Sequence, residues 1–160
     1  MKNAPENSVT IKNLEAAFAG ESMAHIKYLH FAKVARMHGD EATAKVFEET
    51  AAQEVKHALG HADLLFPSKA LSVADVLNYA IEGETYEYTE MYPSFRHSAM
   101  EEGNSDAVAE MDQQIAESKE HAEMFSEVLK KAEHRFAALA KVEEKHAKHY
   151  QSVLAKVANA

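Results

Sequence analysis

Apolar residues recur at alternating spacings of three and four along most of the chain, which is the spacing of amphipathic α-helices. Helix breakers are few, with five Gly and three Pro among 160 residues. The periodicity and the sparse turn residues together predict an all-α fold. The first three helices are expected over residues 9–37, 41–66 and 73–102.

The expected helix ends coincide with residues that stop or start helices. His38-Gly39-Asp40 separates the first helix from the second, and Pro67-Ser68 closes the second. Ser72 and Asp75 have the spacing of a capping box, which favours a helix start directly after Ser72. Pro93 has no backbone N–H, so it is expected to kink the third helix.

The last third of the chain contains neither Gly nor Pro from residue 105 to residue 159. A narrow apolar seam comes first, formed by Val108, Met111, Ile115, Ser118, Ala122, Phe125, Leu129 and Ala132. A broader apolar face follows, formed by Phe136, Leu139, Ala140, Ala147, Tyr150, Val153, Leu154 and Val157. Because the width of the face changes, the pattern predicts two helices, 105–132 and 133–158, in place of one helix about 80 Å long.

These two segments repeat each other at an offset of 25 residues. The string His121-Ala122-Glu123-Met124-Phe125 recurs as His146-Ala147-Lys148-His149-Tyr150, which indicates an internal duplication. The copies differ at one informative position. Ser118 stands three residues before His121, whereas Glu143 stands three residues before His146.

The composition excludes several classes of protein. The absence of Cys rules out disulfides, Cys-ligated metal clusters and thiol catalysis within this chain. Seventeen basic and 26 acidic residues give a net charge of -9, which argues against nucleic acid and anionic membranes as partners. Since neither an apolar leader nor a run of 18 apolar residues occurs, a soluble cytoplasmic protein is expected.

Carboxylates and imidazoles recur at matching positions of the predicted helices. Two helices carry a Glu-x-x-His pair, whose members share one helix face, and two others carry Gly-Glu. The full set is Glu21, Glu54, His57, Glu84, Glu143 and His146. Any one of these residues alone would be an ordinary surface residue, but the joint pattern is the ligand set of ferritin-like di-iron carboxylate bundles. Buried carboxylates need compensating cations, and this mixture of ligands suits iron, manganese or zinc.

Four strings resemble the rubrerythrin family, and the resemblance covers nearly the whole chain. They are Ala17-Phe18-Ala19-Gly20-Glu21-Ser22, Glu54-x-x-His57-Ala58, Gly83-Glu84-x-x-Glu87-Tyr88 through Met91-Tyr92-Pro93, and Val142-Glu143-x-x-His146-Ala147. The resemblance implies a ferritin-like four-helix bundle, here with an additional helix, in a single domain over residues 1–160. It also implies a non-haem di-iron peroxidase that reduces hydrogen peroxide to water as a defence against oxidative stress.

The resemblance further implies a role for each site residue. Glu54 and Glu143 would bridge two iron ions, and Glu21, Glu84 and His146 would be terminal ligands. Glu87 would be a switch ligand, exchanged with His57 as the iron changes oxidation state, and Tyr28 and Tyr92 would donate hydrogen bonds. The implied cofactor is an oxo- or hydroxo-bridged iron pair that cycles between Fe2+ and Fe3+, and manganese or zinc could replace the iron.

Two departures from the family pattern bear on these roles. No Cys-ligated rubredoxin domain is present, so the electrons are expected from an external donor such as rubredoxin or a reductase. The additional segment also offers a second candidate pair, Glu117 and His121, because His121 lies at the distance from Gly103 where the family's last His falls. The apolar pattern favours Glu143 and His146 instead.

The connection between the second and third helices predicts a homodimer. In a ferritin-like bundle these helices run in the same direction, so their link must return over about 33 Å. The eight steps from Leu65 to Val73 span only about 27 Å when fully extended. We therefore expect a domain-swapped dimer in which the first two helices of one chain pack on the later helices of another.

Two other classes of function fit parts of the pattern. A ferroxidase or ferritin-like iron store would use the same ligands with oxygen as the oxidant, although the extra carboxylate of Glu87 favours a redox-cycling site. A metal-free helical interaction protein would use the seam over residues 105–132 as a docking face. Treatment with a chelator distinguishes the metal-free class from the metal-binding classes. Removal of the metal ions should destabilise a metal-binding fold, because its inward carboxylates would lose their compensating charge.

Overall fold

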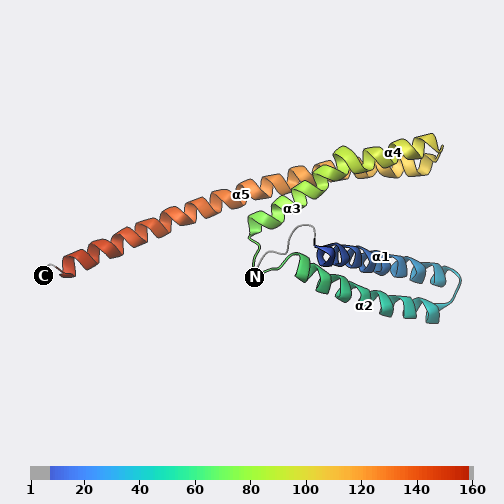
Figure 1. Cartoon of the computed structure of the whole chain (residues 1–160), viewed down its shortest axis with the longest axis horizontal. Helices are drawn as coiled ribbons and strands as arrows, with labels where there is room; N and C mark the ends of the chain where they lie inside the picture. The colour runs from blue at the N-terminus through green and yellow to red at the C-terminus, as the bar shows by residue number, and fades with distance from the viewer. Residues whose placement is uncertain (1–7, 159–160) are drawn as a thin grey trace. The chain divides into compact units, whose positions relative to one another are not determined.

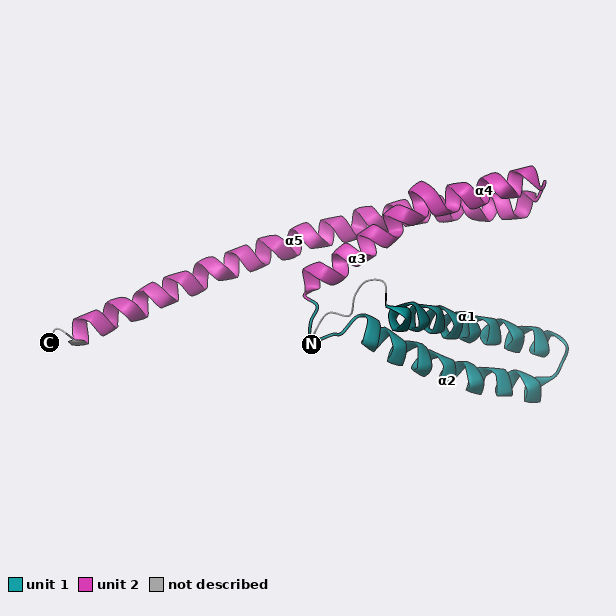
Figure 2. Ribbon diagram, in the orientation of Figure 1, with its two compact units in different colours: residues 1–71 teal, residues 72–160 magenta. Residues whose placement is uncertain are grey.

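The computed structural model describes residues 8–158, and every regular element among them is helical (Figure 1). The elements are α1 (Val9–Met37), α2 (Glu41–Leu65), α3 (Val73–Tyr86), the π-helical segment η1 (Glu87–Met91), α4 (Tyr92–Glu101) and α5 (Ser105–Ala158). The prediction of an all-α fold is confirmed, and the ranges expected for the first two helices agree with α1 and α2 to within one residue. The chain divides into two compact units, Met1–Leu71 and Ser72–Ala160 (Figure 2).

The first unit is a hairpin of α1 and α2. The turn between them depends on Gly39, whose φ of +79° is a conformation that other residues adopt at a cost. Asp40 then caps α2, because its carboxylate accepts the backbone N–H of Thr43 at 2.9 Å and the Thr43 hydroxyl at 2.6 Å. The expected stop at His38-Gly39-Asp40 is therefore built from a left-handed Gly and an N-cap Asp.

Small side chains allow α1 and α2 to pack closely. The buried residues of this pair are Ala32, Ala44, Ala51 and Ala58. Larger contacts lie beside them, where the ring of Phe47 is 5.9 Å from the ring of Tyr28 and 5.6 Å from that of Phe31. Such tilted and edge-on ring pairs add a modest stabilisation beyond the apolar area that they bury.

The second unit begins with the predicted capping box. The Ser72 hydroxyl accepts the backbone N–H of Asp75, and the Asp75 carboxylate accepts the backbone N–H of Ser72 at 2.8 Å. The third helix, expected over 73–102 with a kink at Pro93, is divided into α3, η1 and α4. The π-helical segment η1 ends two residues before Pro93, which lies in the first turn of α4. There the N–H of Tyr92 donates to the carbonyl of Glu87, five residues back. A π-helical turn of this kind is often found at functional sites.

The prediction of a break between residues 132 and 133 is wrong. Residues 105–158 form the single 54-residue helix α5, so the expected additional helix does not exist as a separate element. The start of α5 is capped by the Asn104 side chain, whose Oδ1 accepts the N–H of Ala107 at 3.1 Å. A change in the width of an apolar face alters what a helix can pack against, but without Gly or Pro the backbone hydrogen bonding continues.

Only the first half of α5 is packed within the second unit. α3 and α4 lie against it, and the buried residues of this unit are Ala99, Ser118, Ala122 and Ala132. An ion pair between Arg96 of α4 and Asp112 of α5 joins the two helices near their turn. Residues 133–157 are all exposed, and α5 continues well beyond the start of α3 (Figure 2). Across the described residues, no helix combines the length and the apolar character that crossing a membrane requires.

Candidate metal centre

Three metal-ligating side chains meet in the first unit. Glu21 comes from α1, and Glu54 and His57 come from α2; each offers one ligand atom, and these atoms all lie within 4.8 Å of one another. Their spacing places Glu54 and His57 on the same face of α2, where Nδ1 of His57 lies 3.0 Å from Oε2 of Glu54. Two carboxylates and one imidazole at this separation can bind a divalent cation.

The hairpin holds this cluster partly shielded from solvent. The side chain of Glu54 is 16% exposed, whereas that of His57 is 58% exposed. One turn after Glu21, Nδ1 of His25 lies 2.8 Å from the carbonyl oxygen of Ala51. This contact fixes α1 against α2 close to the cluster, and it is a structural role for an imidazole that the sequence pattern did not single out.

The second unit brings two further predicted carboxylates next to α5. Oε2 of Glu84, on α3, lies 3.4 Å from Nδ1 of His121. Glu87 begins the π-helical segment, and its Oε2 accepts a hydrogen bond of 3.0 Å from the hydroxyl of Ser118. Glu84 and Glu87 thus face Ser118 and His121, which are three residues apart on α5, as Glu54 and His57 are on α2.

The two predicted tyrosines lie in different surroundings. Tyr28 packs in the ring cluster of the first unit, on Phe31 and Phe47. Tyr92 follows η1 on the side of the carboxylates, and the pKa of its phenol is raised above 10.0, first by burial and then by the negative charges of Glu87, Glu84 and Glu110. The phenol of Tyr92 therefore keeps its proton at neutral pH and remains a hydrogen-bond donor.

The structure does not bring Glu143 and His146 to the other ligands of the second unit. Both lie in the exposed half of α5, about 37 Å along the helix from Ser118 and His121. Glu117, the other candidate partner of His121, is hydrogen-bonded to the Gln113 amide at 2.7 Å. The ligand roles expected for Glu143 and His146 stay a prediction.

The contact made by Ser118 was missed by the sequence analysis, although a signal for it existed. The turn at Gly103 is tight, so α3–α4 and α5 are antiparallel neighbours in a fixed register. Residues at similar distances before and after the turn must then meet, which pairs Glu84 with His121 and Glu87 with Ser118. Helical periodicity alone does not contain this information, because it is the same in both copies of the α5 repeat.

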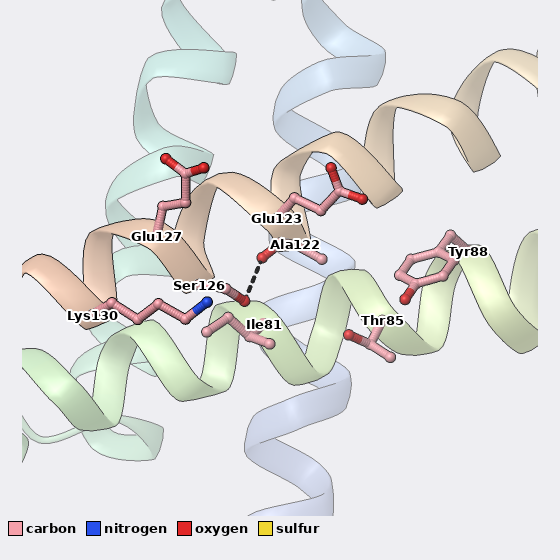
Figure 3. A pocket seen from close by; sticks show the side chains of 8 residues that line it. All are labelled: Ile81, Thr85, Tyr88, Ala122, Glu123, Ser126, Glu127 and Lys130. Atoms are coloured by element: carbon pink, nitrogen blue, oxygen red, sulfur yellow. Dashed lines mark hydrogen bonds between the residues drawn. The ribbon is translucent and has the colours of Figure 1, made fainter.

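An open hollow lies beside these residues, between α3 and α5 (Figure 3). Its volume is about 380 Å³, and it is lined by Ile81, Thr85, Tyr88, Ala122, Glu123, Ser126, Glu127 and Lys130. The dashed line in Figure 3 is the bond from the Ser126 hydroxyl to the carbonyl of Ala122, at 2.8 Å. Thr85 and Tyr88 directly follow Glu84 and Glu87 in the sequence.

Comparison with known proteins gives a consistent result. The family model described as Rubrerythrin matches residues 12–154. A rubrerythrin of Porphyromonas gingivalis is 36% identical over 168 aligned positions, which cover 98% of this chain and 72% of that protein. The nigerythrin of Nitratidesulfovibrio vulgaris is 43% identical over 112 positions, which cover 62% of this chain and 55% of that protein.

A solved structure is also similar to this chain. It is described as the fully reduced, all-ferrous state of nigerythrin, is 35% identical, and aligns over 83% of this chain and 73% of its own with a TM-score of 0.40.

Proposed function

The chain belongs to the rubrerythrin family, and from this premise we propose that it is a non-haem di-iron peroxidase. Membership of the family implies a di-iron oxidoreductase in general. The proposal adds that the substrate is hydrogen peroxide, that the product is water, and that an external protein supplies the electrons. The observation that carries it is the cluster of Glu21, Glu54 and His57, whose ligand atoms lie within 4.8 Å of one another.

The residues present fit a pair of iron ions. The half-site of the first unit offers Glu21, Glu54 and His57, and that of the second unit offers Glu84 and Glu87. Carboxylates with imidazole are ligands for iron, manganese and zinc rather than for softer ions. The four carboxylates of the two half-sites carry four negative charges, which two divalent cations neutralise.

Helix α5 supplies the remaining ligand in this proposal, and the geometry supports His121. Its Nδ1 already lies 3.4 Å from a carboxylate oxygen of Glu84, with a side chain 49% exposed that a small rotation can redirect. Glu143 and His146 would need the exposed half of α5 to reach a half-site elsewhere, such as one on a second copy of the chain. We therefore propose His121 as the α5 ligand and treat Glu143 and His146 as the competing prediction.

A bound diferrous pair supplies the two electrons that, with two protons, convert hydrogen peroxide to two molecules of water. The side chains of this chain position the substrate and deliver protons. Glu87 is the carboxylate without a counterpart in the other half-site, where Ala24 stands at the matching position, and we assign it the switch role. The phenol of Tyr92 keeps its proton beside Glu84 and Glu87 and can donate it to a peroxide oxygen. Tyr28 is assigned the same role for the first half-site.

The functional unit that we propose is a domain-swapped homodimer. The link from Leu65 to Val73 spans about 27 Å when fully extended, whereas a return along a four-helix bundle needs about 33 Å. The second half of α5 also exposes large apolar side chains, which a partner would bury. They are Phe136, Leu139, Val142, Tyr150, Val153, Leu154 and Val157. A second copy of the chain provides both a partner for the half-sites and a surface for this face.

Metal analysis followed by rapid mixing tests the proposed function. We expect about two iron ions per chain in protein from iron-replete cells, and an optical band of the oxidised pair that returns much faster with hydrogen peroxide than with oxygen. Faster oxidation by oxygen with uptake of many iron ions would replace the peroxidase by an iron store. A protein that binds no iron and is unaffected by chelators would be a helical interaction protein instead.

A further inference from the structure

We infer that Ser118 is a positioning residue that holds the carboxylate of Glu87 through its hydroxyl. The inference rests on the proposed function, in which Glu87 is a metal ligand, and it deepens that proposal by assigning a determinant of how Glu87 binds. It concerns the contact between α5 and the π-helical segment, where the Ser118 hydroxyl donates to Oε2 of Glu87 at 3.0 Å.

The first support is burial. Ser118 is 3% exposed and is the one buried polar residue among those that the structure describes. A hydroxyl withdrawn from water needs a hydrogen-bond partner, since an unpaired one is costly. Ser118 has that partner on another element, so the bond is a feature of the packing between α5 and η1 and is shielded from competition by water.

The second support is a contrast with the other helical hydroxyls. Five of them donate to the carbonyl four residues earlier in their own helix, namely Ser22, Thr50, Thr89, Ser98 and Ser126. This local bond is the usual choice for Ser and Thr within a helix. Ser118 instead donates to a carboxylate across the helix interface. Because a hydroxyl carries a single proton, this choice commits the donor of Ser118 to Glu87.

The hydrogen bond from Ser118 restrains the orientation of the Glu87 carboxylate and leaves its other oxygen available to a metal ion. With one lone pair of Oε2 engaged by Ser118, Oε1 is the oxygen that is freer to bind a metal ion. A bond from a neutral hydroxyl to an ionised carboxylate is stronger than one between neutral groups, so the bond restrains Glu87 without neutralising it. The bond therefore favours metal binding through Oε1 of Glu87.

The position of Ser118 also sets the charge of the centre. Ser118 and His121 have the spacing of Glu54 and His57, with a hydroxyl where α2 has a carboxylate. A carboxylate at residue 118 would add a negative charge in direct contact with Glu87. Ser118 therefore supplies a neutral hydrogen-bond donor to Glu87, whereas a carboxylate at the same position would repel Glu87.

Titration with Co2+, followed by its visible absorption, tests this role in the whole chain. We expect the wild type to bind about two Co2+ ions and Ser118→Ala to bind at least one of them about tenfold more weakly, as is common when a group that orients a ligand is removed. Ser126→Ala removes a hydroxyl from the same helix that bonds within that helix, and it should leave both affinities unchanged.

A double substitution separates positioning from a general packing defect. If Ser118 acts through Glu87, then Glu87→Ala with Ser118→Ala should bind Co2+ no more weakly than Glu87→Ala alone. Ser118→Thr, which keeps the hydroxyl, should restore binding. Ser118→Cys, which has nearly the same size but only a weak S–H donor, replaces Ser118→Ala if that variant does not fold. Equal losses in both backgrounds, or wild-type affinity in Ser118→Ala, would overturn the inference alone. A wild type that binds no Co2+ would overturn the proposed function along with it.

Discussion

At the scale of single residues, the two imidazoles of the α5 repeat have unequal surroundings. His121 lies 3.4 Å from Glu84, whereas His146 lies in the exposed half of the helix. We expect His121→Ala to lower the affinity for Fe2+ by about tenfold or more and His146→Ala to leave it unchanged. Anaerobic calorimetric titration measures both affinities, and circular dichroism checks that the helices remain.

The opposite result would be equally informative. Loss of iron binding in His146→Ala, with His121→Ala unaffected, would return the ligand role to Glu143 and His146. Because both residues are exposed, neither substitution should itself destabilise the fold by more than about 0.5 kcal/mol. The comparison therefore reports on binding.

Part of the candidate site could be predicted from the sequence because local spacing determines it. Glu54 and His57 share a helix face in any α-helix that contains them, and the structure places Glu21 beside them. The choice between the two α5 pairs could not be made in this way. Both copies of the repeat have the same periodicity, and only the register fixed by the turn at Gly103 decides which of them faces Glu84.

At the scale of elements, the capping box of α3 gives a stability that depends on pH. Hydrogen bonds from the Ser72 hydroxyl and backbone lower the pKa of Asp75 below 3.8. A carboxyl whose pKa is lower in the folded chain stabilises the fold above its unfolded pKa and loses that effect as the pH falls through its folded pKa. We expect Asp75→Ala to lower the melting temperature by a few degrees at pH 7.

This difference should disappear in acid. Below the lowered pKa of Asp75 the wild-type carboxyl is protonated, so the melting temperatures of the two proteins should converge as the pH falls below that pKa. Thermal unfolding followed by circular dichroism between pH 7 and pH 2 measures both curves. A difference that stays constant over this range would mean that the side chain stabilises α3 by contacts other than its ionised cap.

Element boundaries were predictable where a specific residue enforces them, and less so elsewhere. Gly39 and Asp40 end α1 and start α2, and the Ser72 cap starts α3, as their local chemistry requires. The continuity of α5 and the π-helical form of η1 were not predicted. The π turn depends on how the helices fit their neighbours, since its extra residue changes the face that follows it, and a side-chain pattern does not report that change. The continuity of α5 follows from the absence of Gly and Pro, because a change in the width of an apolar face does not interrupt the backbone hydrogen bonds.

At the scale of the whole molecule, the exposed half of α5 is expected to be part of a dimer interface. Phe136 is 55% exposed and lies on the apolar face of residues 133–157. Replacing it by Asp would place a charge in that interface, so we expect Phe136→Asp to weaken the dimer by at least about tenfold, or 1.4 kcal/mol. Ala138→Asp adds the same charge on the opposite side of the helix and should have no effect.

Light scattering over a range of protein concentrations measures both dissociation constants. A wild type that is a monomer at micromolar concentration would contradict the proposed dimer. Equal dissociation constants for the two variants, with a dimeric wild type, would instead place the interface on another surface.

Domain swapping makes a stronger prediction, because each metal centre would then take its two half-sites from different chains. Glu54→Ala removes a ligand of the first unit, and Glu84→Ala removes one of the second; each variant alone should lose its di-iron centre. When the two are mixed, unfolded and refolded, about half of the dimers contain one chain of each kind, and each of these has one intact centre, so about a quarter of all centres should be restored.

A matched mixture decides whether the restored centres come from swapping. Glu21→Ala and Glu54→Ala both damage the first unit, so no pairing of these two chains yields an intact centre. Centres formed within single chains would leave both mixtures without iron and without peroxidase activity. Recovery in the Glu54→Ala and Glu84→Ala mixture alone would therefore require that two chains share each centre, and the short link between α2 and α3 gives the physical reason for this arrangement.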